Sequence, residues 1–116
     1  MKRMNVVDDR RSEPRFTVEG RVEIQHAGSV LQAQMLDLSL NGALLVLQDG
    51  HGLARDADIT VQLWIDGTCH FNAQASVVYV QATRVGIEFT GMSTADFDVF
   101  SGLILLLARQ RIGLPV

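Results

Sequence analysis

The regular alternation of apolar and polar residues is the feature that most constrains the fold of this chain. It is clearest between residues 59 and 79, where apolar residues occupy alternate positions on both sides of Asp66-Gly67. These apolar residues are Ile59, Val61, Leu63, Ile65, Phe71, Ala73, Ala75, Val77 and Tyr79. Asp-Gly is favoured in the tight turns of β-hairpins, and alternate residues of a strand face the same side. The segment therefore predicts a hairpin with one buried face.

Other segments show the same pattern more weakly. Alternation starts at Phe16 and is interrupted at residues 27–29, which predicts a second hairpin over residues 16–36. Residues 42–47 form a compact apolar strand, and residues 84–89 form a last short one. About six strands joined mostly by short turns favour a mainly β fold, either an antiparallel barrel or a highly curved sheet.

The end of the chain changes to helical periodicity. Ser93, followed three residues later by Asp96, is similar to a helix N-cap, and Gly113 is a suitable stop, so a helix is predicted over about 93–112. The stripe expected to cover the sheet consists of Phe97, Phe100, Ile104 and Leu107. Further apolar residues surround this stripe: Val99, Leu103, Leu105 and Leu106. Either they pack against a second copy of the chain, giving a homodimer through this helix, or the helix is buried deeply within its own domain.

The charge of the chain limits its partners. A net charge of −3 and a pI near 5.5 argue against a general DNA or RNA binder. Six of the ten basic residues nevertheless lie in the first 21 positions, so an anion is expected to bind there. A single cysteine, Cys69, and an N-terminus without an apolar stretch favour the cytoplasm. No apolar run approaches the roughly 20 residues that cross a bilayer, so no membrane insertion is expected.

Arginines gather in the polar segment 1–15, which lacks periodicity and is predicted to be a flexible arm ahead of a folded domain at 16–116. The arm carries Arg10, Arg11 and Arg15. Guanidinium groups pair with phosphate oxygens and with the O6/N7 edge of guanine. In an extended chain Arg11 and Arg15 are roughly 13 Å apart, which suits a ligand of nucleotide size.

A second polar cluster, Asp37-Leu38-Ser39-Leu40-Asn41-Gly42, lies where a strand gives way to a turn. The carboxylate of Asp37 can accept hydrogen bonds from guanine or hold an arginine in place, and the hydroxyl of Ser39 can serve in either role. By the alternation of a strand, Asp37 and Ser39 are expected to face one side, with Leu38 and Leu40 pointing inward. Gly42 permits a positive φ or the close approach of a ligand to the backbone.

Together the two clusters resemble the signature motifs of the PilZ domain family, whose members are bacterial receptors for cyclic diguanylate (cyclic di-GMP). The family pattern is Arg-x-x-x-Arg followed, some twenty to thirty residues later, by Asp or Asn-x-Ser-x-x-Gly. The fixed positions are filled by Arg11, Arg15, Asp37, Ser39 and Gly42, with 21 residues between the motifs. Residues 85–89, Ser93 and the final helix are also similar to the family's usual ending. The resemblance covers about residues 10–111 and identifies the chain as a single-domain member.

The resemblance implies a six-stranded antiparallel β-barrel with a C-terminal helix, and cyclic di-GMP held at the rim under the arginine arm. It implies a non-enzymatic receptor without cofactor, metal or catalytic residues, which signals to an effector protein. The ligand-binding residues it implies are Arg10, Arg11, Arg15, Asp37, Ser39 and Gly42. In the family, an arginine at the position of Arg10 tends to accompany two intercalated ligands instead of one. Tyr79 lies on a strand that often carries an aromatic residue or an arginine near the base.

Other interpretations remain open from the residues. The chain can be a PilZ-like adaptor that acts through protein contacts with an idle nucleotide site, or an oligomerisation module. The arginines alone can be a solvated tail, and the second cluster can be turn chemistry. A metal site is not favoured, because the spacings of the histidines and Cys69 match no usual ligand pattern. A triad of Ser39, Asp37 and a histidine lacks the nucleophile-elbow motif of hydrolases.

Overall fold

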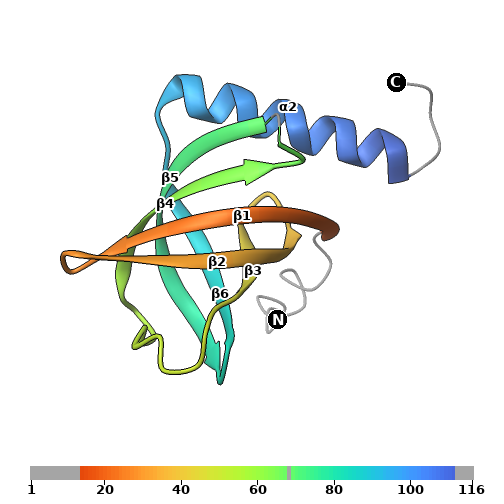
Figure 1. The fold of residues 1–116 in the computed structure, drawn as a ribbon. Helices are drawn as coiled ribbons and strands as arrows, with labels where there is room; N and C mark the ends of the chain where they lie inside the picture. Colours follow the sequence, from red (N-terminus) through yellow and green to blue (C-terminus); the bar gives the residue numbers. More distant parts are fainter. Residues whose placement is uncertain (1–13, 68, 112–116) are drawn as a thin grey trace, which may run out of the picture.

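The computed structural model describes residues 14–67 and 69–111 of the chain. Its elements are β1 (Phe16–His26), β2 (Ser29–Leu38), β3 (Gly42–Val46), β4 (Asp58–Ile65), β5 (Cys69–Gln81), β6 (Arg84–Gly91) and the helix α2 (Thr94–Arg111) (Figure 1). The strands follow one another in the order β1-β2-β3-β6-β5-β4, and β4 pairs back with β1 to close a barrel. Every pair is antiparallel. The predicted six-stranded antiparallel barrel with a C-terminal helix is therefore confirmed.

The interior of the barrel is filled by the alternating apolar residues that predicted the strands. In the β4–β5 hairpin, the series from Ile59 to Val77 is at most 4% exposed. Asp66 and Gly67 adopt positive φ values of 55° and 72° in the connecting turn. Because Asp and Gly tolerate this left-handed conformation better than most residues, the dipeptide fixes the place at which the chain reverses.

Tyr79 departs from the alternation of β5. The pairing between β5 and β6 shifts between Val77 and Tyr79, so Val78 is the extra residue of a β-bulge. Tyr79 is 42% exposed and pairs with Gly86 of β6. The prediction that Tyr79 continues the buried series is therefore wrong, because the extra residue Val78 turns the Tyr79 side chain to the outer face.

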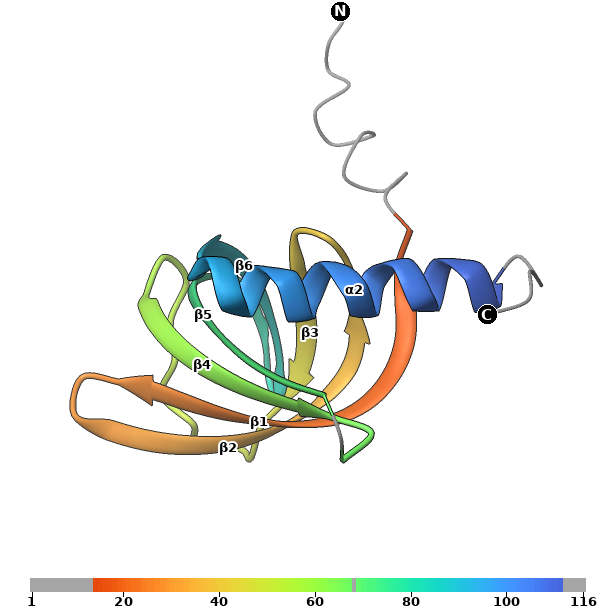
Figure 2. The same ribbon diagram turned by 90° about the horizontal axis from the view of Figure 1, so that it is seen from above.

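The helix α2 lies across one side of the barrel and packs on β5 (Figures 1 and 2). Ser93 caps its first turn: Oγ accepts from the backbone N–H of Asp96 at 3.1 Å and donates to the Asp96 carboxylate at 2.7 Å. The other oxygen of Asp96 accepts from the backbone N–H of Asn72 on β5 at 3.0 Å. The predicted N-cap is thus confirmed, and the same carboxylate ties the helix to the barrel.

The apolar residues of α2 divide into a buried part and an exposed part. Phe100 and Ile104 are 1% and 9% exposed, and Phe100 packs on the barrel residue Phe71 at 5.1 Å between ring centroids. Phe97, expected in the buried stripe, is 51% exposed, and Leu105 is 57% exposed. The stripe is therefore narrower than predicted, and deep burial of the whole helix is wrong. Within residues 14–67 and 69–111, no helix combines the length and apolar character needed to span a bilayer.

Candidate functional site

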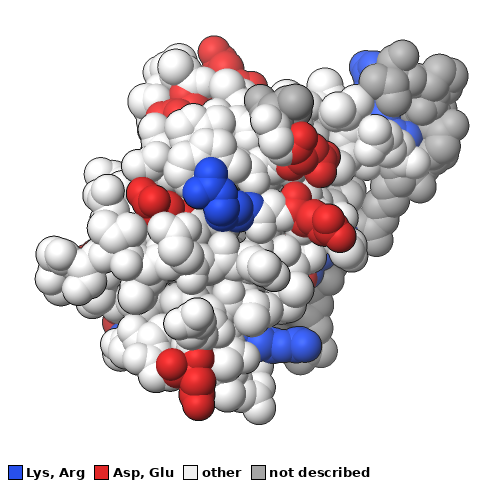
Figure 3. Space-filling view, in the orientation of Figure 1, with Lys and Arg blue, Asp and Glu red and all other residues white. Residues whose placement is uncertain are grey.

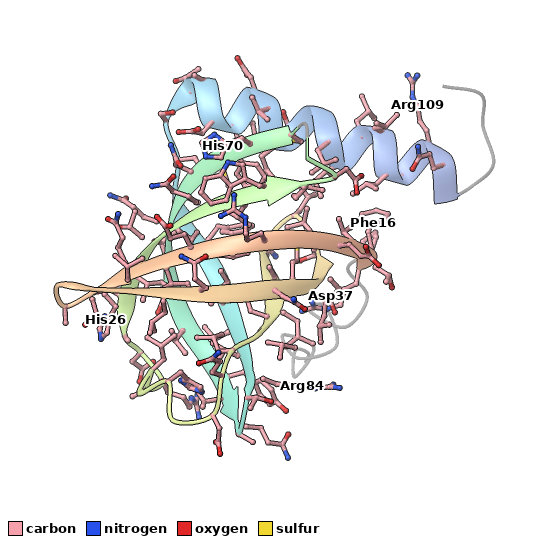
Figure 4. The ribbon with its side chains drawn as sticks, in the orientation of Figure 1. Phe16, His26, Asp37, His70, Arg84 and Arg109 are labelled. Carbon is pink, nitrogen blue, oxygen red and sulfur yellow. The ribbon has the colours of Figure 1, made fainter. Side chains whose placement is uncertain are left out.

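Arg15 and Asp37 meet on the outer face of the barrel. Arg15 directly precedes β1, and Asp37 lies near the end of β2, paired with Thr17. Nη1 of Arg15 donates to Oδ1 of Asp37 at 2.7 Å, and the two side chains are 47% and 21% exposed. Figure 4 shows Asp37 close to Phe16, the first residue of β1, at one end of the barrel. One member of each sequence cluster is thus brought together where solvent, and a solute, can reach it.

The outward direction of Asp37 depends on an irregularity in β2. Ala33 and Met35 are 5% and 3% exposed, so strict alternation would also bury residue 37. The pairing of β2 with β3 shifts between Met35 and Asp37, which leaves Leu36 as the extra residue of a bulge. Beyond the bulge Leu38 is fully buried, as expected, and the carboxylate beside it faces outward.

Ser39 belongs to the interior of the turn that follows β2. It is 1% exposed, its Oγ donates to the Gly42 carbonyl at 3.4 Å, and the same Oγ accepts from the Asn41 backbone N–H at 3.3 Å. The expectation that Ser39 shares an exposed face with Asp37 is therefore not met. Leu40, expected to point inward, is 55% exposed, and that expectation is wrong. Both differences arise because the alternation of a strand ends where the turn begins.

The close packing of two strands requires a glycine at position 42. A Cβ at this position would lie 1.9 Å from the carbonyl oxygen of Ile87 on the neighbouring strand β6. Gly42 does not have a positive φ. The absence of a side chain at Gly42 lets β3 approach β6 closely. This close packing sets the position of the turn between Asp37 and β3.

A row of outward-facing residues runs across the barrel from Asp37. In the strand register Asp37 pairs with Leu44 of β3, Leu44 pairs with Gly86 of β6, and Gly86 pairs with Tyr79 of β5. A Cβ at Gly86 would lie 3.1 Å from the Cβ of Tyr79, and the Tyr79 hydroxyl donates to the Gln81 side chain. Gly86 is buried beneath the Tyr79 ring. The row therefore starts at a carboxylate, continues through half-buried Leu44 and ends at an exposed aromatic ring.

The structure places four of the six predicted ligand-binding residues. Arg15 and Asp37 form the ion pair, whereas Ser39 and Gly42 shape the turn that follows it. Arg10 and Arg11 lie outside the described residues.

Among the described residues, the acidic, histidine and cysteine side chains form no metal-binding cluster, and two of them have a shifted pKa. No cluster of three or more His, Cys, Asp or Glu side chains is arranged to hold a metal ion in this part of the chain. Burial raises the pKa of the Cys69 thiol, and the charge of Asp66 raises it further by a smaller amount. The hydrogen bond from Ser93 lowers the pKa of Asp96 most, and the hydrogen bond from the Asn72 backbone lowers it further. Neither Cys69 nor Asp96 belongs to the Arg15–Asp37 ion pair.

Comparison with known families adds an independent observation to this geometry. The sequence model of the PilZ domain matches residues 9–106, which is most of the chain and includes both motifs. The chain belongs to the PilZ domain family. The resemblance inferred from the residues is thus confirmed. No curated protein matches the sequence.

Several solved structures share the fold, and two of them are PilZ domains. The PilZ domain of YcgR from Escherichia coli, solved with c-di-GMP, has a TM-score of 0.72 and 18% identity, and the match covers 90% of this chain and 98% of that one. The PilZ domain of CeSA from a cellulose-synthesizing bacterium has a TM-score of 0.65 and 18% identity, covering 82% and 98%. The Bacillus subtilis inhibitor of motility MotI/DgrA has a TM-score of 0.74 and 17% identity, and the match covers 90% of this chain and 52% of the MotI/DgrA chain. This PilZ chain thus spans about half the length of MotI/DgrA.

Proposed function

We propose that this PilZ protein is a receptor for cyclic di-GMP that acts without catalysing a reaction. PilZ domains bind this nucleotide, and the YcgR domain with the same fold was solved with it. The observation that carries the proposal is the ion pair: two motif residues, 22 positions apart in the sequence, lie within hydrogen-bond distance on an accessible surface. A guanidinium next to a carboxylate suits a ligand that combines phosphates with guanine edges.

In the proposed mechanism Asp37 orients Arg15 before the ligand arrives. Nη1 of Arg15 donates to Asp37, which holds the guanidinium beside the carboxylate, and guanidinium groups bind phosphate oxygens through planar, charge-assisted hydrogen bonds. The second carboxylate oxygen of Asp37 can accept from the N–H groups of guanine. Arg10 and Arg11, from the arm predicted at residues 1–15, would close over the bound nucleotide and present a changed surface to an effector protein.

The outward row gives the proposed ligand a surface to lie on. Leu44 of this row is half-buried, and the exposed ring of Tyr79 covers Gly86 at the far end. Stacking of a base on an aromatic ring contributes about 1–3 kcal/mol. We assign Tyr79 to the base, and we assign Ser39 and Gly42 to shaping the turn that holds Asp37.

Calorimetry with cyclic di-GMP tests the proposal on the full chain. Replacing Arg15 by alanine should weaken binding about 10- to 100-fold, because hydrogen bonds to a charged group contribute about 1.5–3 kcal/mol. Arg55→Ala removes the same charge from an exposed loop position and should leave the affinity within a factor of about two. If Arg15→Ala binds as tightly as the unmodified protein, the role assigned to Arg15 is wrong. If the unmodified protein does not bind, the receptor function is wrong.

A second function is favoured by the exposed apolar side chains of α2. Phe97 and Leu105 are each more than half exposed, and such residues often mark protein contacts. The alternative is an adaptor or homodimer that contacts another protein through this helix. Sedimentation over a range of concentrations tests the homodimer, and a strictly monomeric result would exclude it.

A further inference from the structure

Three side chains from three strands form a stack on the outer face of the barrel, separate from the Arg15–Asp37 pair. Arg21 of β1 pairs in register with Trp64 of β4, and Trp64 pairs with His70 of β5. The rings of Trp64 and His70 are 4.7 Å apart and inclined by 14°, and Cζ of Arg21 lies 4.2 Å from the Trp64 ring centroid. We call these three residues the stack.

The stack remains accessible although its members contact one another. Arg21 and His70 are exposed, and Trp64 is half-buried between them. A purely structural role is the simplest explanation, because cross-strand aromatic pairs stabilise sheets. Tryptophan and arginine are, however, the residue types most enriched where partner proteins bind, and here both lie on one exposed surface.

Acidic residues surround the stack. Glu19 and Glu23 lie two residues before and after Arg21, so they share the outer face of β1 with it. Asp66 lies in the turn that follows Trp64, and Asp96 of α2 is close enough to His70 for the histidine to influence its pKa. Figure 3 shows this face, with a basic group in its middle and acidic groups on both sides. We call Glu19, Glu23, Asp66 and Asp96 the acidic rim.

We propose that the stack and its acidic rim form a docking surface for a basic segment of a partner protein. Lysine or arginine side chains of that segment pair with the rim carboxylates, and one of its apolar side chains packs against the accessible edge of Trp64. Aromatic residues and arginine are enriched in the centre of protein interfaces, the rim is polar, and complementary charge selects the partner. The four rim carboxylates outnumber the single guanidinium of Arg21, so the surface favours a basic segment. Nucleic acids and anionic membranes are disfavoured, because the rim would repel their phosphates.

The proposed surface can act together with a nucleotide, but it does not depend on one. Arg21 lies six residues beyond Arg15, which is about 20 Å along an extended strand. Figure 4 shows His70 near α2 and Asp37 at the end of β2, on different parts of the barrel. A partner on the stack and a ligand at the ion pair can therefore bind at the same time.

Trp64 is the single tryptophan of the chain, so its fluorescence and its indole N–H signal in NMR report on the stack directly. The probe is a short peptide of alternating lysine and leucine, compared with the same peptide in which glutamate replaces lysine. We expect the lysine peptide to shift the Trp64 indole signal and to change its emission at low salt. The glutamate peptide should do neither.

Paired charge variants separate a specific surface from general attraction to an acidic protein. Glu19→Gln with Glu23→Gln should weaken binding of the lysine peptide about tenfold, because it removes two of the rim charges. Asp49→Asn with Asp56→Asn changes the net charge equally at exposed positions in the loop before β4, and should change the affinity less than about twofold. Both pairs leave the stack intact, and circular dichroism checks that both fold. Equal weakening by the two pairs, shifts confined to the exposed residues of α2, or no binding at low salt would overturn the proposal.

Discussion

The guanidinium of Arg15 donates to the carboxylate of Asp37 at 2.7 Å across the first two strands of the barrel. Neither residue is deeply buried, so the pair is worth about 1 kcal/mol or less to folding. Its value lies in holding two oppositely charged groups in a fixed relation on an open surface. Stability and ligand affinity should therefore respond differently when the pair is broken.

Replacing Asp37 by asparagine tests this separation. The variant keeps the shape of the side chain and removes its charge, so the free energy of unfolding in urea should fall by about 1 kcal/mol or less. The affinity for cyclic di-GMP in calorimetry should fall about tenfold or more, because the charged acceptor for guanine is lost. Asp49→Asn, in an exposed loop, is the matched control and should change neither quantity measurably. A variant that loses several kcal/mol of stability without losing affinity would contradict the assignment.

Tyr79 gives a second test of the ligand surface. Tyr79→Leu removes the ring and should weaken the binding of cyclic di-GMP about tenfold, since base stacking contributes about 1–3 kcal/mol. Tyr79→Phe keeps the ring and removes only the hydroxyl that donates to Gln81, so it should bind nearly as well as the unmodified protein. Equal affinities for both variants would show that the ring does not contact the base.

Gly42 should be sensitive to the smallest substitution. In Gly42→Ala the added methyl group meets the carbonyl oxygen of Ile87, and the strands must separate, which should cost about 3 kcal/mol or more. Gly102→Ala is the control, because nothing lies within 4 Å of the added atom and the position is helical. That variant should be about 1 kcal/mol more stable than the unmodified protein. Urea unfolding of the two variants measures both, and a tolerated Gly42→Ala would mean that β3 and β6 can move apart easily.

Much of the architecture could be predicted from the sequence, because alternation and turn residues act locally. Asp66-Gly67 marks the β4–β5 turn, and Ser93 marks the start of the helix; both features follow from residues within a few positions. The bulges at Leu36 and Val78 could not be predicted in the same way. A single inserted residue reverses the faces of all residues beyond it, and whether it occurs depends on pairing with a distant strand.

The candidate site was predictable in its composition but less so in its geometry. The motif residues identified Asp37 correctly as a surface group, whereas the burial of Ser39 depends on a turn whose hydrogen bonds the sequence does not specify. The stack was missed altogether. Arg21, Trp64 and His70 each occupy an outward position in the alternation, but only the pairing of β1 with β4 brings the arginine to the tryptophan.

The lowered pKa of Asp96 predicts how stability changes with acid. Its carboxylate accepts from Ser93 and then from the Asn72 backbone, so the ionised form is favoured in the folded state. A depressed folded pKa stabilises the protein above the unfolded value of about 3.9, and this contribution disappears as the pH falls through the folded pKa. Asp96→Asn should therefore flatten the dependence of urea stability on pH below about 4, whereas the neighbouring Asp98→Asn should leave this part of the curve in place. Identical curves for the unmodified protein and Asp96→Asn would show that the hydrogen bonds from Ser93 and Asn72 do not favour the ionised carboxylate.

Cys69 should react slowly with thiol reagents in the folded protein. Burial first, and the charge of Asp66 second, raise the pKa of its thiol, so less of the reactive thiolate is present at mildly alkaline pH than in the unfolded chain. Asp66→Asn removes the second cause and should speed alkylation by iodoacetamide severalfold at most, because the first cause remains. Asp49→Asn should leave the rate unchanged, and urea should raise it more than either substitution. Alkylation that is as fast in the folded protein as in urea would show that Cys69 is not protected by the barrel.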